Sequence, residues 1–331
     1  MENLFTECPI EEVTKYLKEH FPYVTIGIVG EWEGLQCAIE KGGNATQALS
    51  GVEHFPEVCF IVACGGSEEI DVAKSYRLPY LVLTKELPIS AFQKIGINDF
   101  QIMEYGYPNI VIIDTNKNEL QLQGDLTFLL LSILLECVGI VGSGLREGRV
   151  REAKEITQKV KEMLLDFAPI KEVLPEISEL LEKISGARFS CSLERIIALN
   201  FPTEFAHARF YSIFCLLYVL CLFTKIDFCV ILPHMDLIRV RMLAEEIGLK
   251  IVPKTISSKD VEWKLSFVKD LLPTKGELEG YLKRFRMESG KGKVDYKFVL
   301  SSLLLTSTLI KEPNLLVEVL ESGYVDALID L

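Results

Sequence analysis

Residues 58–88 read VCFIVACGGSEEIDVAKSYRLPYLVLTKELP, and this stretch decides the fold. Its first six residues are apolar and rich in β-branched side chains, which is typical of a buried strand. After Gly65-Gly66-Ser67, apolar and charged residues alternate as they do on a helix, and residues 80–84 form a second apolar run. A strand, two glycines, a helix and another strand predict a βαβ unit with parallel strands.

The two glycines suit an anion-binding turn. Without a Cβ they let backbone N–H groups face a ligand at close range. The helix that follows adds free N–H groups and the positive end of its dipole, which favour pyrophosphate. A plain strand-to-helix turn also uses two glycines, so the spacing alone leaves both interpretations open.

The segment resembles the GGG-x-x-x-D-x-A-K stretch of the iron-containing alcohol dehydrogenase superfamily, especially its glycerol-1-phosphate dehydrogenase and glycerol dehydrogenase branch. Ser67 stands in place of the third glycine, and the positions that match are Gly65, Gly66, Asp71, Ala73 and Lys74. Residues 79–84 resemble the family's P-x-x-x-V-P-T strand, one residue shorter and with Leu83 for the second proline. The resemblance implies that NAD or NADP binds through its pyrophosphate at Gly65, Gly66 and Ser67. It also implies that Asp71 and Lys74 line this loop, with Thr84 near the adenosine or nicotinamide side.

Composition narrows the class of protein. The chain has 331 residues, enough for two domains, and a net charge of −12. An acidic surface argues against nucleic acid and anionic membranes as partners. The nine cysteines form no C-x-x-C pair, which favours reduced thiols in a cytoplasmic protein, and the acidic N-terminus predicts no signal peptide. The apolar runs at 126–141 and 210–224 fall short of the roughly 20 residues of a membrane span, so we expect buried helices there.

Periodicity divides the chain into two predicted domains. Residues 1–121 read as an α/β, Rossmann-like domain with a mostly parallel sheet, including a helix from Pro9, strands at 23–29 and 109–115, and a short helix at 44–50. Gly30 and Gly34 read as a structural turn, with the alternative that this turn lies beside the nucleotide. Residues 122–331 read as an all-helical domain, and the resemblance implies a dehydroquinate synthase-like fold for the whole. The helices expected there span 124–142, 147–166, 171–185, 191–199, 204–224, 235–247, 258–270, 276–287, 295–310 and 313–329.

The resemblance further implies a divalent metal (zinc, nickel or iron) held by one aspartate and two histidines, which would polarise the alcohol oxygen. Asp125 matches the family aspartate, although its place in the sequence also suits a helix N-terminus. His207 matches the histidine of an H-G-E-x-V motif, although a lone histidine there also suits a satisfied polar residue. The second histidine has no counterpart, and Glu194 is the residue able to replace it. No catalytic residue is assigned.

The predicted function is therefore an NAD(P)-dependent, metal-assisted dehydrogenase acting on a small polyol or polyol phosphate. The incomplete metal motif favours a first alternative, a catalytically inactive relative that serves as a nucleotide-binding sensor or partner subunit. A second alternative is a cyclase of the dehydroquinate synthase type. The oligomeric state stays open, with a homo-oligomer among the options.

Overall fold

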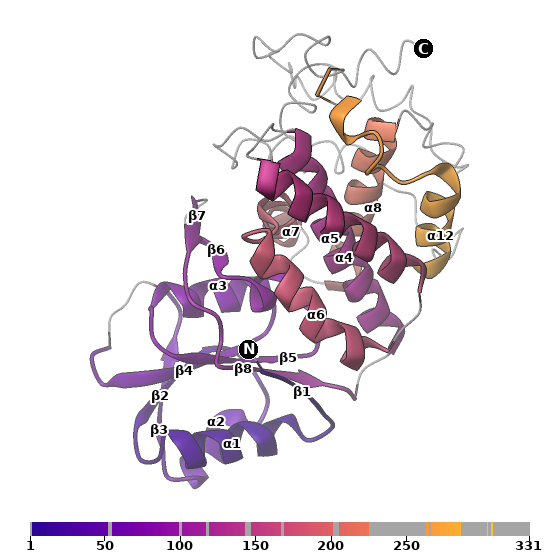
Figure 1. Ribbon diagram of the computed structural model, residues 1–331. Coiled ribbons are helices and arrows are strands. Elements are labelled where there is room, and N and C mark those ends of the chain that lie inside the picture. Colours follow the sequence, from indigo (N-terminus) through magenta and orange to yellow (C-terminus); the bar gives the residue numbers. More distant parts are fainter. Residues whose placement is uncertain are drawn as a thin grey trace. The chain divides into compact units, whose positions relative to one another are not determined.

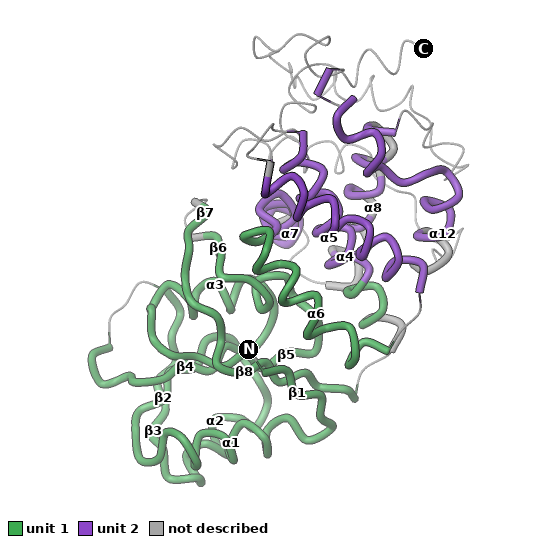
Figure 2. Tube along the Cα trace, viewed as in Figure 1, with its two compact units in different colours: residues 1–126, 169–186 green, residues 127–168, 187–331 purple. Residues whose placement is uncertain are grey.

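The computed structural model describes residues 2–51, 55–98, 101–116, 119–142, 147–166, 169–200, 205–224, 263–264, 266–285, 303 and 306. The chain forms two compact units (Figure 2). Unit 1 comprises residues 1–126 and 169–186, and unit 2 comprises residues 127–168 and 187–331. The boundary predicted after residue 121 lies close to the end of the first segment of unit 1, whereas the return of residues 169–186 to that unit was not predicted.

Unit 1 is built on a six-stranded sheet in which every pairing is parallel. The spatial order is β1-β8-β5-β4-β2-β3 (Figure 1). The strands span Glu2–Thr6 (β1), Thr25–Gly30 (β2), Ala45–Leu49 (β3), Val58–Cys64 (β4), Tyr80–Thr84 (β5) and Ile110–Asp114 (β8). This arrangement confirms the α/β fold class and the central βαβ unit.

Helices cover both faces of this sheet, which explains why its central strands are almost continuously apolar. In Figure 1, α1 (Pro9–His20) and α2 (Leu35–Lys41) lie on one face, and α3 (Ser67–Ser75) and α6 (Ile170–Lys183) lie on the other. The α1–α2 face buries a cluster to which β4 contributes Phe60 and Val62. Burying one such large apolar side chain stabilises the fold by about 1.5 to 3 kcal/mol.

Residues 44–50 correct one prediction. They were expected to form a short helix, but Ala45–Leu49 is strand β3, paired with β2 from Thr25 to Val29. Pairing overrides the weak local helix propensity, because β2 supplies partners for the backbone groups of β3. Leu49 also packs closely on Gly27, where an added Cβ would lie 2.4 Å from its Cδ1. Strand β1 was not predicted either.

A compact segment follows β5 in unit 1. It contains a short 3₁₀ helix, η1 (Ile89–Phe92), whose four residues are all buried. Strands β6 (Ile95–Asn98) and β7 (Gln101–Glu104) then pair antiparallel outside the main sheet. None of these elements was predicted from the sequence.

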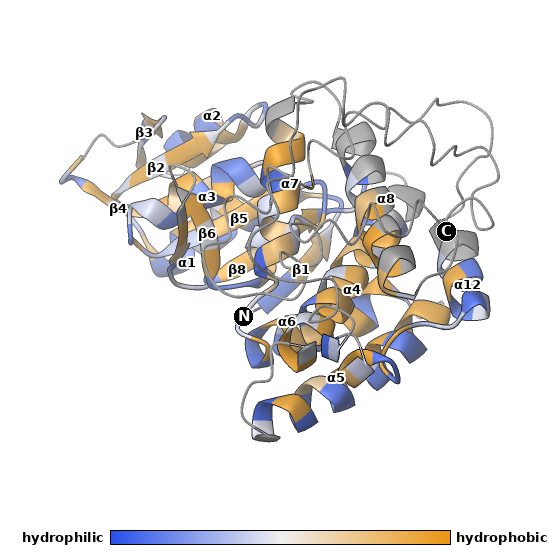
Figure 3. Ribbon diagram, turned by 90° about the horizontal axis from the view of Figure 1, so that it is seen from above, coloured by the Kyte–Doolittle hydropathy of each residue, from blue (hydrophilic) through white to orange (hydrophobic). Residues whose placement is uncertain are grey.

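The described part of unit 2 is helical, as predicted. The helices are α4 (Glu119–Gly142, which begins in unit 1), α5 (Glu147–Leu165), α7 (Arg188–Asn200), α8 (Phe205–Thr224) and α12 (Lys275–Phe285). Helix α4 is apolar along most of its length, whereas α5 alternates between polar and apolar residues (Figure 3). Among the described residues, Leu122–Gly142 alone has the length and hydropathy of a membrane span, and 89% of its most apolar window is buried in the protein. That burial is what a core helix requires.

The helices expected at 235–247, 295–310 and 313–329 lie largely or wholly outside the described residues. Residues 263–264 and 266–268, within the helix expected at 258–270, are helical.

Candidate functional site

The sheet of unit 1 has a topological switch point between β2 and β4. From β2 the chain passes through α2 to β3, which lies on one side of β2. From β4 it passes through α3 to β5, which lies on the opposite side of β4. In open parallel sheets the carboxyl ends of two such strands border the crevice where ligands bind.

Glycines end both strands at this point. Gly30, the last residue of β2, pairs with Cys64, the last residue of β4, and has φ +80°. A Cβ on Gly30 would lie 2.1 Å from the Cys64 carbonyl oxygen. Gly65 follows with φ +140°, and its N–H donates to the Leu83 carbonyl at 3.0 Å. Both positions therefore require glycine.

The predicted pyrophosphate loop leads directly into α3. Gly66 is the residue before the helix, and Ser67 is the first residue of α3. The N–H groups and the positive dipole end of this first turn lie beside the switch point. The first acceptor there is internal, because the Glu69 carboxylate accepts the Gly66 N–H at 2.9 Å.

Trp32 and Lys85 meet across the end of β4. Trp32 follows β2, Lys85 follows β5, and β4 lies between those two strands. The Lys85 Nζ lies 4.7 Å from the centre of the Trp32 ring, a cation–π contact. This contact places one aromatic ring and one cation beside the Gly65–Gly66 turn.

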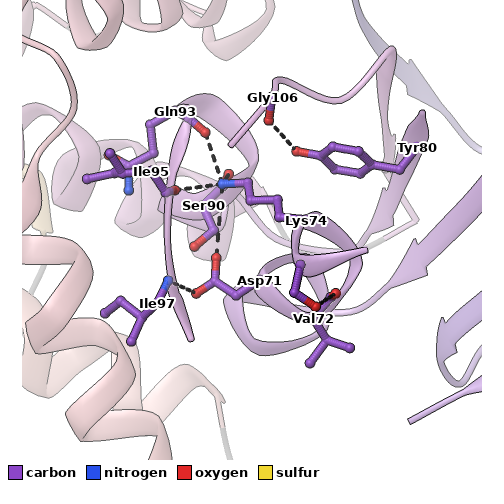
Figure 4. Close-up of polar contacts among 10 residues, drawn as sticks. Asp71, Val72, Lys74, Tyr80, Ser90, Gln93, Ile95, Ile97 and Gly106 are labelled. Atoms are coloured by element: carbon purple, nitrogen blue, oxygen red, sulfur yellow. Dashed lines mark hydrogen bonds and ion pairs between the residues drawn. The ribbon is translucent and has the colours of Figure 1, made fainter. Parts of the chain in front are cut away.

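Asp71 and Lys74, predicted to line the loop, are buried in unit 1 on α3 (Figure 4). The Lys74 ammonium donates to three backbone carbonyls, those of Ser90 at 2.6 Å, Gln93 at 2.9 Å and Ile95 at 2.7 Å. Three donors are all that an ammonium has, so these bonds use its full capacity. The Asp71 carboxylate lies 4.0 Å from the Lys74 ammonium.

Asp71 also holds the segment that follows η1. Its Oδ2 accepts the Ile97 N–H at 3.1 Å. Close packing requires Gly96 beside it, since a Cβ there would lie 2.6 Å from Oδ1 of Asp71. Nearby, the buried Tyr80 hydroxyl donates to the Gly106 carbonyl at 3.0 Å (Figure 4). Burial, and then the charge of Asp71, raise the pKa of Tyr80.

Asp125, the predicted metal ligand, is buried at the start of α4 and holds the same segment. Its Oδ2 accepts the Leu87 N–H at 3.0 Å. Three predicted site residues, Asp71, Lys74 and Asp125, thus hold the backbone between Leu87 and Ile97. Thr84 is also buried, and its hydroxyl accepts the Glu86 N–H at 3.1 Å in the turn after β5.

Glu194, the predicted substitute for a metal-binding histidine, forms an ion pair within unit 2. It lies on α7, and its Oε1 is 2.7 Å from a guanidinium nitrogen of Arg209 on α8. Both side chains are buried, and the Arg209 guanidinium stacks 4.2 Å from the centre of the Phe128 ring. His207 lies on α8 as predicted, but its side chain falls outside the described residues.

The described side chains do not fit a metal site. Within the part of the chain that the structure describes, no three His, Cys, Asp or Glu side chains come together as ligands. A guanidinium beside Glu194 already balances its charge and would repel a dication. Metal ligation by Asp125, His207 and Glu194 therefore stays a prediction without geometric support, and no chemical step is derived from it.

Three residues at the switch point were not predicted from the sequence, namely Glu69, Trp32 and Lys85, and a place beside the nucleotide was only the alternative interpretation of Gly30. Signals for Gly30 and Glu69 were present in the sequence. Gly30 directly follows an apolar strand, and Glu69 stands three residues after the glycine that precedes α3, which is the spacing of a capping box. Placing Gly30 beside Gly65 required the strand order.

No protein-family model matches this chain, and no curated protein matches it either. Solved structures do match. The sulfoacetaldehyde reductase of Bifidobacterium kashiwanohense in complex with NAD+ has a TM-score of 0.47 and 10% identity, covering 99% of this chain and 96% of that one. The iron-containing alcohol dehydrogenase of Corynebacterium glutamicum has a TM-score of 0.45 and 13% identity, covering 98% and 94%. A probable glycerol dehydrogenase of Sinorhizobium meliloti has a TM-score of 0.44 and 12% identity, covering 99% and 96%.

These structures include an iron-containing alcohol dehydrogenase and a probable glycerol dehydrogenase. Similarity of this degree does not by itself establish an activity. The fold assignment rests on the parallel sheet and the helices of the chain itself.

Proposed function

We propose that this protein binds NAD(H) or NADP(H) at the carboxyl ends of β2 and β4. One observation carries the proposal: the switch point of a parallel sheet is bordered by Gly30 and Gly65, and the N-terminus of α3 lies beside them. In this class of sheet, such a place is where a pyrophosphate meets backbone N–H groups.

The proposal assigns direct contact to the loop and support to the residues behind it. The backbone N–H groups of Gly66 and Ser67 would donate to the pyrophosphate, and Gly65, whose own N–H donates to the Leu83 carbonyl, would allow its close approach. Asp71 and Lys74 would act indirectly, since their side chains hold the segment from Ser90 to Ile97. Thr84 would act in the same indirect way, through the turn that precedes Glu86.

The proposed reaction is the oxidation of a small polyol, or its phosphate, to the carbonyl compound. When bound, NAD(P)+ would supply the acceptor for the hydride that the alcohol carbon loses, and the hydroxyl proton would pass to solvent. The cofactor supplies the redox chemistry, while the protein binds and orients it.

The test is calorimetric titration of the purified chain with NADH and NADPH, repeated with zinc, with nickel and with EDTA. Binding of either nucleotide supports the proposal, and a screen of polyols and polyol phosphates for reduction of NAD(P)+ then tests the reaction. Absence of binding up to millimolar nucleotide would refute it.

A second candidate is a nucleotide-binding sensor or partner subunit without catalysis. The specific observation in its favour is the buried ion pair of Glu194 and Arg209. The Arg209 guanidinium already pairs with the carboxylate that a metal would need as a ligand. Nucleotide binding that is indifferent to metal, together with no turnover of any polyol, would favour this candidate over the dehydrogenase.

A further inference from the structure

The Glu69 side chain fills the space that Gly30 and Gly65 leave at the switch point because they have no side chains. This space is called the anion notch below. A Cβ on Gly65 would lie 2.7 Å from the Glu69 Oε2, and a Cβ on Gly30 would lie 2.8 Å from its Cγ. The side chain thus folds back from the first turn of α3 across the ends of both strands. A glycine is needed at both ends to make room for it.

The carboxylate of Glu69 also accepts a hydrogen bond from the backbone N–H group that an anionic ligand would bind. Its Oε2 accepts the Gly66 N–H at 2.9 Å, which is half of a capping box, since Gly66 has no side chain to complete it. Another carboxylate, that of Glu86, lies close by, because a Cβ on Gly66 would be 3.8 Å from its Oε2. A phosphate entering the notch would meet negative charge before it met the N–H group.

We propose that Glu69 is a displaceable internal occupant of this anion notch, and that it lowers the affinity of the loop for the ligand's phosphate. The inference rests on the proposed nucleotide site and concerns its regulation. Glu69 is partly exposed, so rotation about its side-chain bonds can carry the carboxylate into solvent. A ligand can bind only when the carboxylate has moved away. Its apparent dissociation constant is therefore the intrinsic one divided by the fraction of molecules in which the notch is open.

Removing the Glu69 carboxylate should therefore tighten binding. For Glu69→Ala we expect at least a tenfold lower dissociation constant for NADH and for inorganic pyrophosphate. Glu69→Gln should show a smaller gain, because the amide keeps the bulk and an acceptor oxygen but loses the charge.

The matched control is Glu68→Ala. Glu68 is exposed, lies on the same turn and carries the same charge, and none of the distances to the three glycines involves it. A general loss of negative charge would affect both variants alike, so we expect less than a threefold change for Glu68→Ala. Circular dichroism and thermal unfolding of each variant report whether it folds, and Glu69→Gln serves if Glu69→Ala does not.

The outcomes separate the two levels of the proposal. Tighter binding by Glu69→Ala but not by Glu68→Ala supports Glu69 as the occupant. Measurable binding by the unmodified chain that Glu69→Ala leaves unchanged or weakens would overturn the occupant while the nucleotide site stands. No binding by any folded form would overturn the nucleotide site and the occupant with it.

Discussion

Lys74 is a fully buried lysine whose ammonium is held by three backbone carbonyls. Lys74→Met would leave those carbonyls without their donor and would leave the nearby Asp71 carboxylate without its counter-ion. We expect the free energy of unfolding to fall by about 3 to 5 kcal/mol, the usual cost of breaking a buried charge pair. Urea unfolding followed by circular dichroism measures this change.

Lys94→Met is the control for that substitution. Lys94 lies in the same segment, but its side chain is 44% exposed and pairs with Glu182 at 3.5 Å. An exposed pair contributes at most about 1 kcal/mol. Equal losses for the two variants would contradict a structural role for Lys74.

Gly30 occupies a position that excludes every other residue. Gly30→Ala would place a Cβ on a backbone with φ +80° and against the Cys64 carbonyl. We expect a loss of at least about 2 kcal/mol in the free energy of unfolding, from the left-handed conformation and the clash together. Gly148→Ala, on the exposed start of α5 with no atom near the added Cβ, should change it by less than about 1 kcal/mol.

The Cys64 thiol should be unreactive in the folded protein. Burial, followed by the charge of Glu69, raises the pKa of Cys64 from 9.0 to about 12. Because the folded pKa lies above the unfolded one, the stabilisation by the neutral thiol is complete below pH 9 and is lost as the pH rises toward 12. Between pH 9 and 11 the free energy of unfolding should thus fall more steeply for the unmodified chain than for Cys64→Ala. Parallel slopes would contradict the raised pKa.

At the scale of elements, the contact between α7 and α8 depends on the buried pair of Glu194 and Arg209. Arg209→Met would leave a buried carboxylate without its cation, and we expect a loss of about 3 to 5 kcal/mol. The double variant Glu194→Met with Arg209→Met should recover much of that loss, because no charge stays buried. Unfolding in urea measures both, with Arg151→Met on the exposed face of α5 as the control.

Strong hydrophobic patterns made most elements predictable. The runs at 60–64 and 80–84 are buried throughout, and the long helices α4, α5, α7 and α8 begin and end within a few residues of the expected positions. Strands β1 and β3 were not predicted from the sequence. They form the edges of the sheet, where each pairs with only one neighbouring strand, and their composition is mixed. Their place is set by pairing, which lies outside the local sequence.

The candidate site was predictable only in part, for a similar reason. A glycine pair between a strand and a helix marks Gly65 and Gly66 from local sequence. Chain order could not show that Asp71, Lys74 and Asp125 reach one backbone segment, because the bonds join residues up to 38 positions apart. Residue types that suit a ligand also suit buried structural contacts, and only three-dimensional partners distinguish the two.

At the scale of the whole molecule, the described chemistry is unevenly divided between the two units. Unit 1 holds the glycine-bordered switch point, whereas the buried Glu194 carboxylate of unit 2 is neutralised by Arg209. The central claim is therefore about unit 1: a nicotinamide dinucleotide binds where β2 and β4 end.

Hydrogen–deuterium exchange of the full chain, with and without saturating NADH, tests this claim most directly. We expect slower amide exchange in peptides that cover residues 30–34 and 64–69, and little change in β3 and α5. The same experiment on Glu69→Ala, at lower NADH, should protect the same peptides. Protection elsewhere with none at these two segments would contradict the account.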